Sequence, residues 1–353
     1  MRATGAKGLS PCARATRIEK PEAGGVLPNA NSDALMLTYE HIFLAYEASL
    51  RGALLERLGG DATLLPASPT GLRDADRNVG FFALALYNDE RRRVPRRRRR
   101  IHLSDEYATD ARKGTFEPKL SQLLQLLEAG DSAVNDAANE FLSKTVEHVF
   151  WNRRGDIVLG TDGLPEVFQD YMLYDWGIHH FHIEPGRGKH LLFVMLRGDD
   201  AYVLKIGTHG QEFNDAGILE VAHRHWPQLL PQVQGITVEK QFTPDEIGNL
   251  RRGNVAYALN VAGKTVMPLD LRATNGTPVR VTVGRDMVAR QLRALADALA
   301  DQSGEWAGQL RSALGGEPDE VVVTLTFRPA AMAEAVLFRA GGAGPWASVR
   351  LAP

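Results

Sequence analysis

Histidines gather in one short part of this chain. The segment GIHHFHIEP, residues 177–185, contains His179, His180 and His182, and His209 follows in the segment LKIGTHGQEF. Imidazoles coordinate metals such as zinc, and they transfer protons near neutral pH because their ordinary pKa is about 6.5. They also serve as hydrogen-bonded residues of a protein core. Metal binding, proton transfer and a purely structural role are therefore the three interpretations of this cluster.

The spacing of the histidines predicts which of them can meet. If residues 178–183 form a β-strand, alternate side chains point to opposite faces of the sheet. His180 and His182 then share one face with Glu184, whereas His179 points to the other face. His209 directly follows a second expected strand. We therefore expect His180, His182 and His209 to converge on one site.

A metal site is one interpretation of this convergence. Three imidazoles with an open fourth position are the arrangement that catalytic zinc favours, and imidazole also suits other divalent metals. The ligands would be His180, His182 and His209. No carboxylate at a recognisable metal-ligand spacing accompanies them. A zinc- or other metal-dependent hydrolase is therefore kept as an alternative function.

Proton transfer without a metal or other cofactor is the interpretation that we favour. Cleaving RNA through its own 2′-OH needs a base for that proton, an acid for the 5′-oxygen and cations for the phosphate charge. Histidines supply both proton roles. We expect the phosphate and base contacts, and the carboxylates that support the imidazoles, to come from Arg187, Lys189, Phe213, Trp176, Asp175 and Glu184. A metal-independent endoribonuclease is the function that this set predicts.

The third interpretation involves no chemistry. If the imidazoles are hydrogen-bonded residues of the scaffold, the chain is a non-catalytic module that binds nucleic acid or protein. Binding would then survive the loss of His182 and His209.

The stretch from Trp176 to Phe213 resembles the C-terminal half of a known toxin family. WGIHHFHIEP followed by LLFVMLRGDDAYVLKIGTHGQEF is similar to the YafQ-like branch of RelE-type mRNA interferase toxins, over about 38 of the 353 residues. The resemblance implies a small twisted antiparallel sheet flanked by helices. It also implies cleavage of mRNA on the ribosome by a toxin or phage-defence effector, with an antitoxin or inhibitor protein as its partner.

The same resemblance implies roles for individual residues. His182 in HIEP and His209 in GTH would transfer the protons, and Phe213 would contact a base. The aspartate that the family has shortly after EP is replaced here by GRGKH. His180 is then expected as the auxiliary residue, and Lys189 in this loop as a phosphate contact.

The rest of the sequence predicts an α+β chain that positions this β-rich core. Apolar residues at helical spacing predict helices at 118–130 and 286–302, and β-rich runs predict strands at 178–183, 190–196, 201–207, 277–284 and 320–327. Four parts are expected: a disordered tail at 1–33, a mostly helical region at 34–160 with an arginine-rich loop at 91–100, a histidine-bearing β core at 161–235, and a C-terminal α+β domain at 236–353.

Composition narrows the class of protein. The formal net charge is −2, so nucleic acid binding would need a local basic surface such as the arginine run ERRRVPRRRRR. That run is equally interpreted as a solvated linker. A single cysteine excludes a disulfide framework within the chain. With no apolar run of the roughly 18 residues that a membrane helix needs, we expect a cytoplasmic protein that does not contact the membrane.

Overall fold

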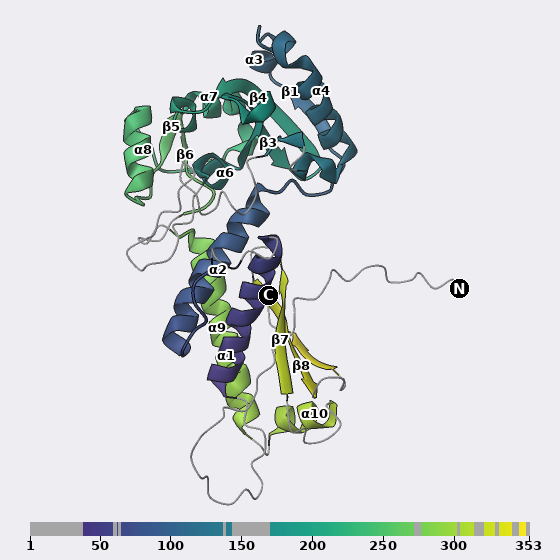
Figure 1. Cartoon of the computed structure of the whole chain (residues 1–353). Helices are drawn as coiled ribbons and strands as arrows, with labels where there is room; N and C mark the ends of the chain where they lie inside the picture. Colours follow the sequence, from purple (N-terminus) through teal and green to yellow (C-terminus); the bar gives the residue numbers. More distant parts are fainter. Residues whose placement is uncertain are drawn as a thin grey trace, which may run out of the picture. The chain divides into compact units, whose positions relative to one another are not determined.

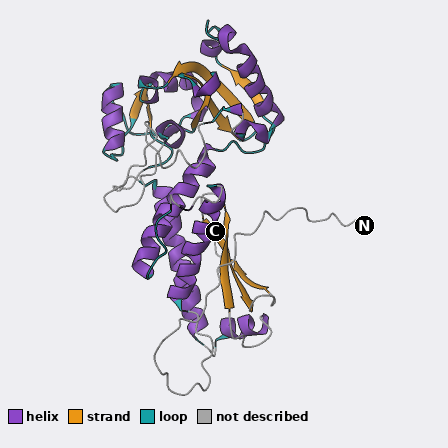
Figure 2. Cartoon of the chain, viewed as in Figure 1, coloured by secondary structure: helices purple, strands orange, loops and turns teal. Residues whose placement is uncertain are grey.

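The computed structural model describes most of the chain. The described residues are 38–58, 62, 65–136, 139–142, 170–271, 277–301, 304–313, 321–328, 332–340 and 346–350. The tail predicted at 1–33 lies outside them. The described chain is α+β, and it forms two compact units (Figures 1 and 2). One unit is Asn88–Thr282, and the other joins Met1–Tyr87 to Val283–Pro353. This division differs from the expected boundaries at 160 and 235, because segments from both ends of the sequence pack together.

The unit formed by the two ends combines helices with an antiparallel sheet. Its elements are α1 (Tyr39–Arg57), most of α2 (Leu72–Arg92), most of α9 (Val279–Ala300), α10 (Glu305–Ala313), β7 (Val321–Arg328), β8 (Met332–Ala340) and β9 (Trp346–Arg350). The strand order is β7-β8-β9. The backbone N–H of Leu325 donates to the Ser49 hydroxyl at 3.3 Å, which ties β7 to α1.

The strand predicted at 277–284 is wrong, because α9 begins at Val279. Alternating valines suggested a period of two. In the helix, Val281 is buried and lies on the same face as Val288 and Leu292, seven and eleven residues further on, whereas Val283 is 47% exposed. The helix prediction at 286–302 and the strand prediction at 320–327 are confirmed by α9 and β7.

The unit Asn88–Thr282 is built on a mixed four-stranded sheet. Its strands are β1 (Arg100–Leu103), β2 (Ile178–His182), β3 (His190–Arg197) and β4 (Asp200–Thr208), in the order β1-β4-β3-β2. The three predicted strands pair antiparallel, and Gly198 with a φ of 54° makes the turn between β3 and β4. β1 instead pairs parallel with β4, so an entirely antiparallel sheet was the wrong expectation. Parallel pairing is available because a long crossover, residues 104–199, separates the two strands.

Both faces of this sheet are covered. On one face, α4 (Lys113–Ala129) packs Leu120, Leu123 and Leu127 against Phe181 and other strand residues. The opposite face carries α7 (Gly217–His225), α8 (Pro244–Arg252) and the hairpin of β5 (Leu259–Val261) with β6 (Lys264–Val266). Residues 236–271 therefore belong to the histidine-bearing core and not to a separate C-terminal domain.

Short elements complete this unit. They are α3 (Asp105–Ala108), α6 (Tyr171–Trp176) and the 3-10 turns Ser132–Asn135, Pro185–Arg187, Gln211–Phe213 and Pro227–Leu229. The helix predicted at 118–130 is confirmed by α4, which ends at Ala129 and has Gly130, with a φ of 69°, as its C-cap.

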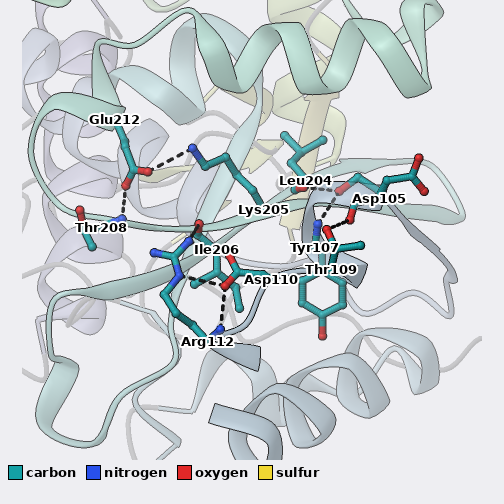
Figure 3. Close-up of polar contacts among 11 residues, drawn as sticks. Asp105, Tyr107, Thr109, Asp110, Arg112, Leu204, Lys205, Ile206, Thr208 and Glu212 are labelled. Carbon is teal, nitrogen blue, oxygen red and sulfur yellow. Dashed lines mark hydrogen bonds and ion pairs between the residues drawn. The ribbon is translucent and has the colours of Figure 1, made fainter. Parts of the chain in front are cut away.

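A β-bulge lies in β4 shortly before His209. The register shifts so that Phe193 faces Lys205 while Val194 faces Val203, which leaves Leu204 as the extra residue. The hydroxyl of Ser104 donates to the carbonyl of Leu204. Arg112, paired with Asp110, donates to the carbonyl of Ile206 at 2.7 Å (Figure 3). The bulged strand is thus anchored by the segment that follows β1.

The arginine run is part of the folded unit. Arg91 and Arg92 end α2, and Arg100 begins β1. Arg99 is buried and donates to the carbonyls of Arg97 at 2.7 Å and Pro95 at 2.9 Å. The run therefore lies within one unit and is not a linker between two, and its loop is limited to residues 93–99, in which Arg96, Arg97 and Arg98 are exposed to solvent. Across the described ranges, no helix is long and apolar enough to span a membrane.

Candidate active site

β2 and the end of β4 bring three imidazoles together. The ring centroid of His182 lies 5.2 Å from that of His209 and 6.2 Å from that of His180. The centroids of His180 and His209 are 6.0 Å apart. His180 and His182 share a face because they are two residues apart on β2, and His209 directly follows β4, the strand beyond β3. One small reacting group can therefore contact all three rings.

The three rings differ in their access to solvent. His182 is 4% exposed, His180 is half-buried and His209 is exposed. The cluster thus extends from the core to the surface, and His209 is its most solvent-accessible member.

A buried carboxylate holds His180. Nδ1 of His180 lies 3.1 Å from Oδ2 of Asp170, and the other carboxylate oxygen accepts the N–H of Leu173 at 3.1 Å as the N-cap of α6. Burial alone would raise the pKa of Asp170, but the neighbouring His180 and Arg92 outweigh it and hold that pKa well below its usual range. Asp170 is therefore ionised, and its negative charge lies beside the His180 ring.

The backbone sets the tautomer of His182. Its Nδ1 lies 3.4 Å from the carbonyl oxygen of Gly188, and a carbonyl can only accept a hydrogen bond. In the neutral ring Nδ1 therefore carries the proton and Nε2 is the proton-accepting atom. The N–H of His182 donates to the carbonyl of Phe141 at 2.8 Å, which fixes the end of the strand.

Phe213 forms a wall of the cluster. Its ring lies parallel to that of His209 at 5.5 Å, and its centroid is 4.9 Å from His180 and 5.9 Å from Phe193. The N–H of His209 donates to the carbonyl of Lys189 at 3.1 Å, which ties His209 to the loop between β2 and β3. One face of Phe213 is used by His209, so its first role here is to position the imidazoles.

Glu184 closes the β2–β3 loop instead of supporting His180 and His182. Its carboxylate accepts hydrogen bonds from the ring and the backbone N–H of His190, and these bonds hold the pKa of Glu184 below its usual value. A Cβ at Gly188 would lie 1.9 Å from Oε2 of Glu184, so only glycine fits there without moving this pair. The expected support of the imidazoles by Glu184 is therefore corrected.

The two basic residues expected to contact phosphate lie in the same loop. Lys189 is exposed, and its carbonyl already accepts from His209. Arg187 ends the short turn Pro185–Arg187, and its side chain lies outside the described part of the structure.

Trp176 and Asp175 do not reach the cluster. Trp176 is 1% exposed and packs on Tyr257 with centroids 6.5 Å apart, so it cannot stack on a base that enters from solvent. Asp175 is also buried, and it accepts from Nε of Arg251 at 2.8 Å and from the hydroxyl of Tyr257 at 2.6 Å. Both expectations were wrong because the turn of α6 directs these two side chains into the core.

Arg251 is a residue that the sequence analysis missed. Besides its pair with Asp175, it donates to the carbonyl of Phe213 and, at 2.7 Å, to Oδ1 of Asn214. α8 thereby holds the segment that carries Phe213. No local motif marks Arg251, because its partners other than Tyr257 lie 37 to 76 residues away in the sequence.

His179 points to the opposite face, as strand alternation predicts. It is 8% exposed and lies parallel to Phe181 with centroids 5.9 Å apart. Burial lowers the pKa of His179 to about 3, so the ring is neutral and belongs to the core.

The described residues contain no group of three or more His, Cys, Asp or Glu side chains arranged to hold a metal ion. Comparison with protein-family models, curated proteins and solved structures gives no match for this chain.

Proposed function

We propose that this chain is a metal-independent endoribonuclease in which His182 and His209 transfer the protons. The carrying observation is the 5.2 Å separation of their ring centroids at one end of the sheet, with Nε2 of His182 as the proton-accepting atom. The resemblance to RelE-type toxins supports the same pair. A cytoplasmic toxin or defence effector that acts on RNA, on the ribosome, and that is restrained by an antitoxin or inhibitor belongs to this proposal.

The reaction divides between the two histidines. Nε2 of His182 takes the proton from the 2′-OH, whose oxygen forms a bond to the adjacent phosphorus. The bond between phosphorus and the 5′-oxygen breaks, and protonated His209 gives that oxygen its proton. The products are a 2′,3′-cyclic phosphate and a 5′-OH, and the reaction needs no redox partner or cofactor. The buried His182 suits the base role and the exposed His209 suits the leaving group.

In this proposal His180 and Lys189 stabilise the negative charge of the phosphate. When His180 is protonated, Asp170 balances its charge and its Nε2 can donate to a phosphate oxygen. Lys189 is exposed beside His209 and adds a second cation. His180 is thus an auxiliary residue, and Asp170 is a positioning residue that acts through it.

The test is cleavage of RNA by purified protein in excess EDTA, with and without ribosomes. We expect wild type to cleave and His182→Ala and His209→Ala to lose about 100-fold or more of the rate, the range typical of a lost acid or base. His223→Ala, a half-buried histidine on α7 outside the cluster, is the matched control and keeps the rate.

Two outcomes contradict the proposal. If EDTA abolishes cleavage and a divalent metal restores it, His180, His182 and His209 are the ligands of a metal-dependent hydrolase. If RNA is bound but cleaved under neither condition, with or without ribosomes, the chain is a non-catalytic binding module.

A further inference from the structure

The arginine loop meets a strip of aromatic rings beside the edge strand β1. Arg100 pairs with Asp200 at 2.8 and 3.1 Å, and Nε2 of His102 lies 2.8 Å from the same carboxylate. These contacts follow the parallel register, which places Arg100 opposite Asp200 and His102 opposite Tyr202. The charged and aromatic residues therefore lie on one face, at the edge of the sheet.

The rings continue from β1 across β4 to the end of α7. His102 lies parallel to Tyr202 with centroids 4.8 Å apart, and Tyr202 lies 5.0 Å from Trp226. All three residues are half-buried, so part of each side chain is accessible to solvent while the rest packs against its neighbours. We call Arg96, Arg97, Arg98, Arg100, His102, Tyr202 and Trp226 the edge strip.

Positive charge dominates the edge strip. Arg96, Arg97, Arg98 and Arg100 are exposed, and the carboxylates that pair with them in the described contacts are those of Asp199 and Asp200. Arg97 lies 3.4 Å from Asp199, whose side chain is 72% exposed, so this pair is solvated and easily exchanged for a phosphate. The buried Arg99 fixes the conformation of this loop through its hydrogen bonds to two loop carbonyls.

The arginine run itself contains no aromatic residue, but in the folded chain aromatic rings from β4 and the end of α7 lie beside its positive charge. Cations that follow a backbone together with rings that stack on bases are the two elements that proteins use to bind single-stranded nucleic acid. In a duplex, the bases are stacked on each other and their faces are not available to the rings.

We propose that the edge strip is a second nucleic acid site, which binds single-stranded RNA. Tyr202 and Trp226 stack on bases, and the exposed arginines contact phosphates. Tyr202 and His209 are seven positions apart along the chain, which is about 23 Å at the rise of a strand, so the edge strip is distinct from the histidine cluster. Binding at the edge strip does not require the chain to cleave RNA.

The test uses a probe that cannot be cleaved, a labelled single-stranded 2′-O-methyl oligouridylate of roughly 12 nucleotides. Because the probe has no free 2′-OH, its binding is measured independently of the proposed ribonuclease activity. Binding by the full chain is followed by fluorescence anisotropy between about 50 and 200 mM salt. We expect affinity to fall steeply with salt.

Two variants separate charge from stacking. Replacing Arg96, Arg97 and Arg98 with serine should lower the slope of log affinity against log salt by about 2, since each lost phosphate contact contributes about 0.7 for a single strand. Tyr202→Leu keeps an apolar side chain against the core and should weaken binding about 5- to 100-fold, the range for one lost base stack, with the slope unchanged. Thermal unfolding checks that both variants are folded.

The matched control removes the same charge elsewhere. Lys240 in the segment before α8, Arg252 at the end of α8 and Lys264 in β6 are exposed, and their replacement with serine should leave affinity within about 2-fold of wild type.

Three results overturn the proposal. An equal loss in the two triple variants would mean attraction by overall charge alone. An unchanged affinity in Tyr202→Leu, or equal affinity for duplex RNA, would exclude stacking. Displacement of the probe by polyglutamate as effectively as by unlabelled RNA would make the edge strip a surface for an acidic protein.

Discussion

Nδ1 of His180 lies 3.1 Å from Oδ2 of Asp170, a carboxylate that is buried at the start of α6. Asp170 thus has two tasks, because it caps the helix that leads into β2 and it orients an imidazole of that strand. A helix start and a site residue are fixed by the same side chain.

Asp170→Asn separates these two tasks. Asparagine is also a good N-cap, so α6 keeps the bond to the N–H of Leu173. The neutral amide no longer balances a charge on His180, and we expect the cleavage rate near pH 7 to fall about 10- to 100-fold, as when other supporting carboxylates are lost. Initial rates and the unfolding temperature would be measured together. A large loss of stability with an unchanged rate would show that Asp170 serves only the helix.

Asp170 also predicts how stability depends on pH. Its pKa in the folded chain lies well below the unfolded value of about 3.9, so the stabilisation is fully present above that pH. It is lost as the pH falls below about 3.9, because the unfolded chain then binds a proton that the folded chain does not. In urea unfolding, the difference in free energy between wild type and Asp170→Asn should shrink as the pH falls through this range. A difference that stays constant would contradict this.

The buried His179 gives a second pH dependence in a different range. Its folded pKa of about 3 lies below the unfolded value of about 6.5, so the unfolded chain gains a proton first as the pH falls. Stability is fully present above about pH 6.5 and is lost from there toward pH 3, at a limiting slope of about 1.4 kcal/mol per pH unit. His179→Phe keeps a ring beside Phe181. In this variant the free energy of unfolding should depend less steeply on pH between about pH 6 and 4 than in wild type. An unchanged slope would mean that His179 is protonated in the folded chain.

Gly188→Ala tests the loop that faces His182. The added methyl group would meet the Glu184 carboxylate, which must then leave His190, and the carbonyl of Gly188 would move away from Nδ1 of His182. We expect a cleavage rate at least about 10-fold lower. Glu184→Ala in the same chain removes the obstacle, so the double variant should be more active than Gly188→Ala alone. If the double variant lost as much activity as the two single variants combined, the clash with Glu184 would not be the cause of the lower rate.

Arg251→Met tests the support of Phe213 from α8. The change leaves the buried Asp175 without its cation, and breaking such a pair costs about 3 to 5 kcal/mol of unfolding free energy. Denaturant unfolding measures this cost. Arg252→Met, one residue further on the exposed side of α8, is the control and should change stability by less than about 0.5 kcal/mol. Similar costs in the two variants would contradict a special role for Arg251.

Local patterns predicted the part of the fold that carries the histidines. A period of two placed His180 and His182 on one face, and the β-rich runs marked the strands that became β2, β3 and β4. Long-range partners were out of reach of such patterns. Asp170 and Asp175 both precede β2, and only the turn of α6 decides that Asp170 meets His180 while Asp175 meets Arg251.

Contacts between distant segments also explain where the arginine run and the domain boundaries differ from the predictions. Nothing in the arginine run reveals that Arg99 is buried or that Tyr202 and Trp226 lie nearby, because these rings come from other elements. The parallel pairing of β1 and the joining of the two chain ends into one unit also depend on contacts between distant segments.

The most direct test of the proposed mechanism is the chemistry of the RNA ends. Metal-depleted wild type is incubated with RNA and EDTA, with ribosomes if they are needed, and the fragments are analysed by mass spectrometry. The account predicts fragments that end in a 2′,3′-cyclic phosphate and begin with a 5′-OH, and it predicts their absence with His182→Ala. Fragments that carry a 5′-phosphate and a 3′-OH, formed only when a divalent metal is supplied, would contradict it.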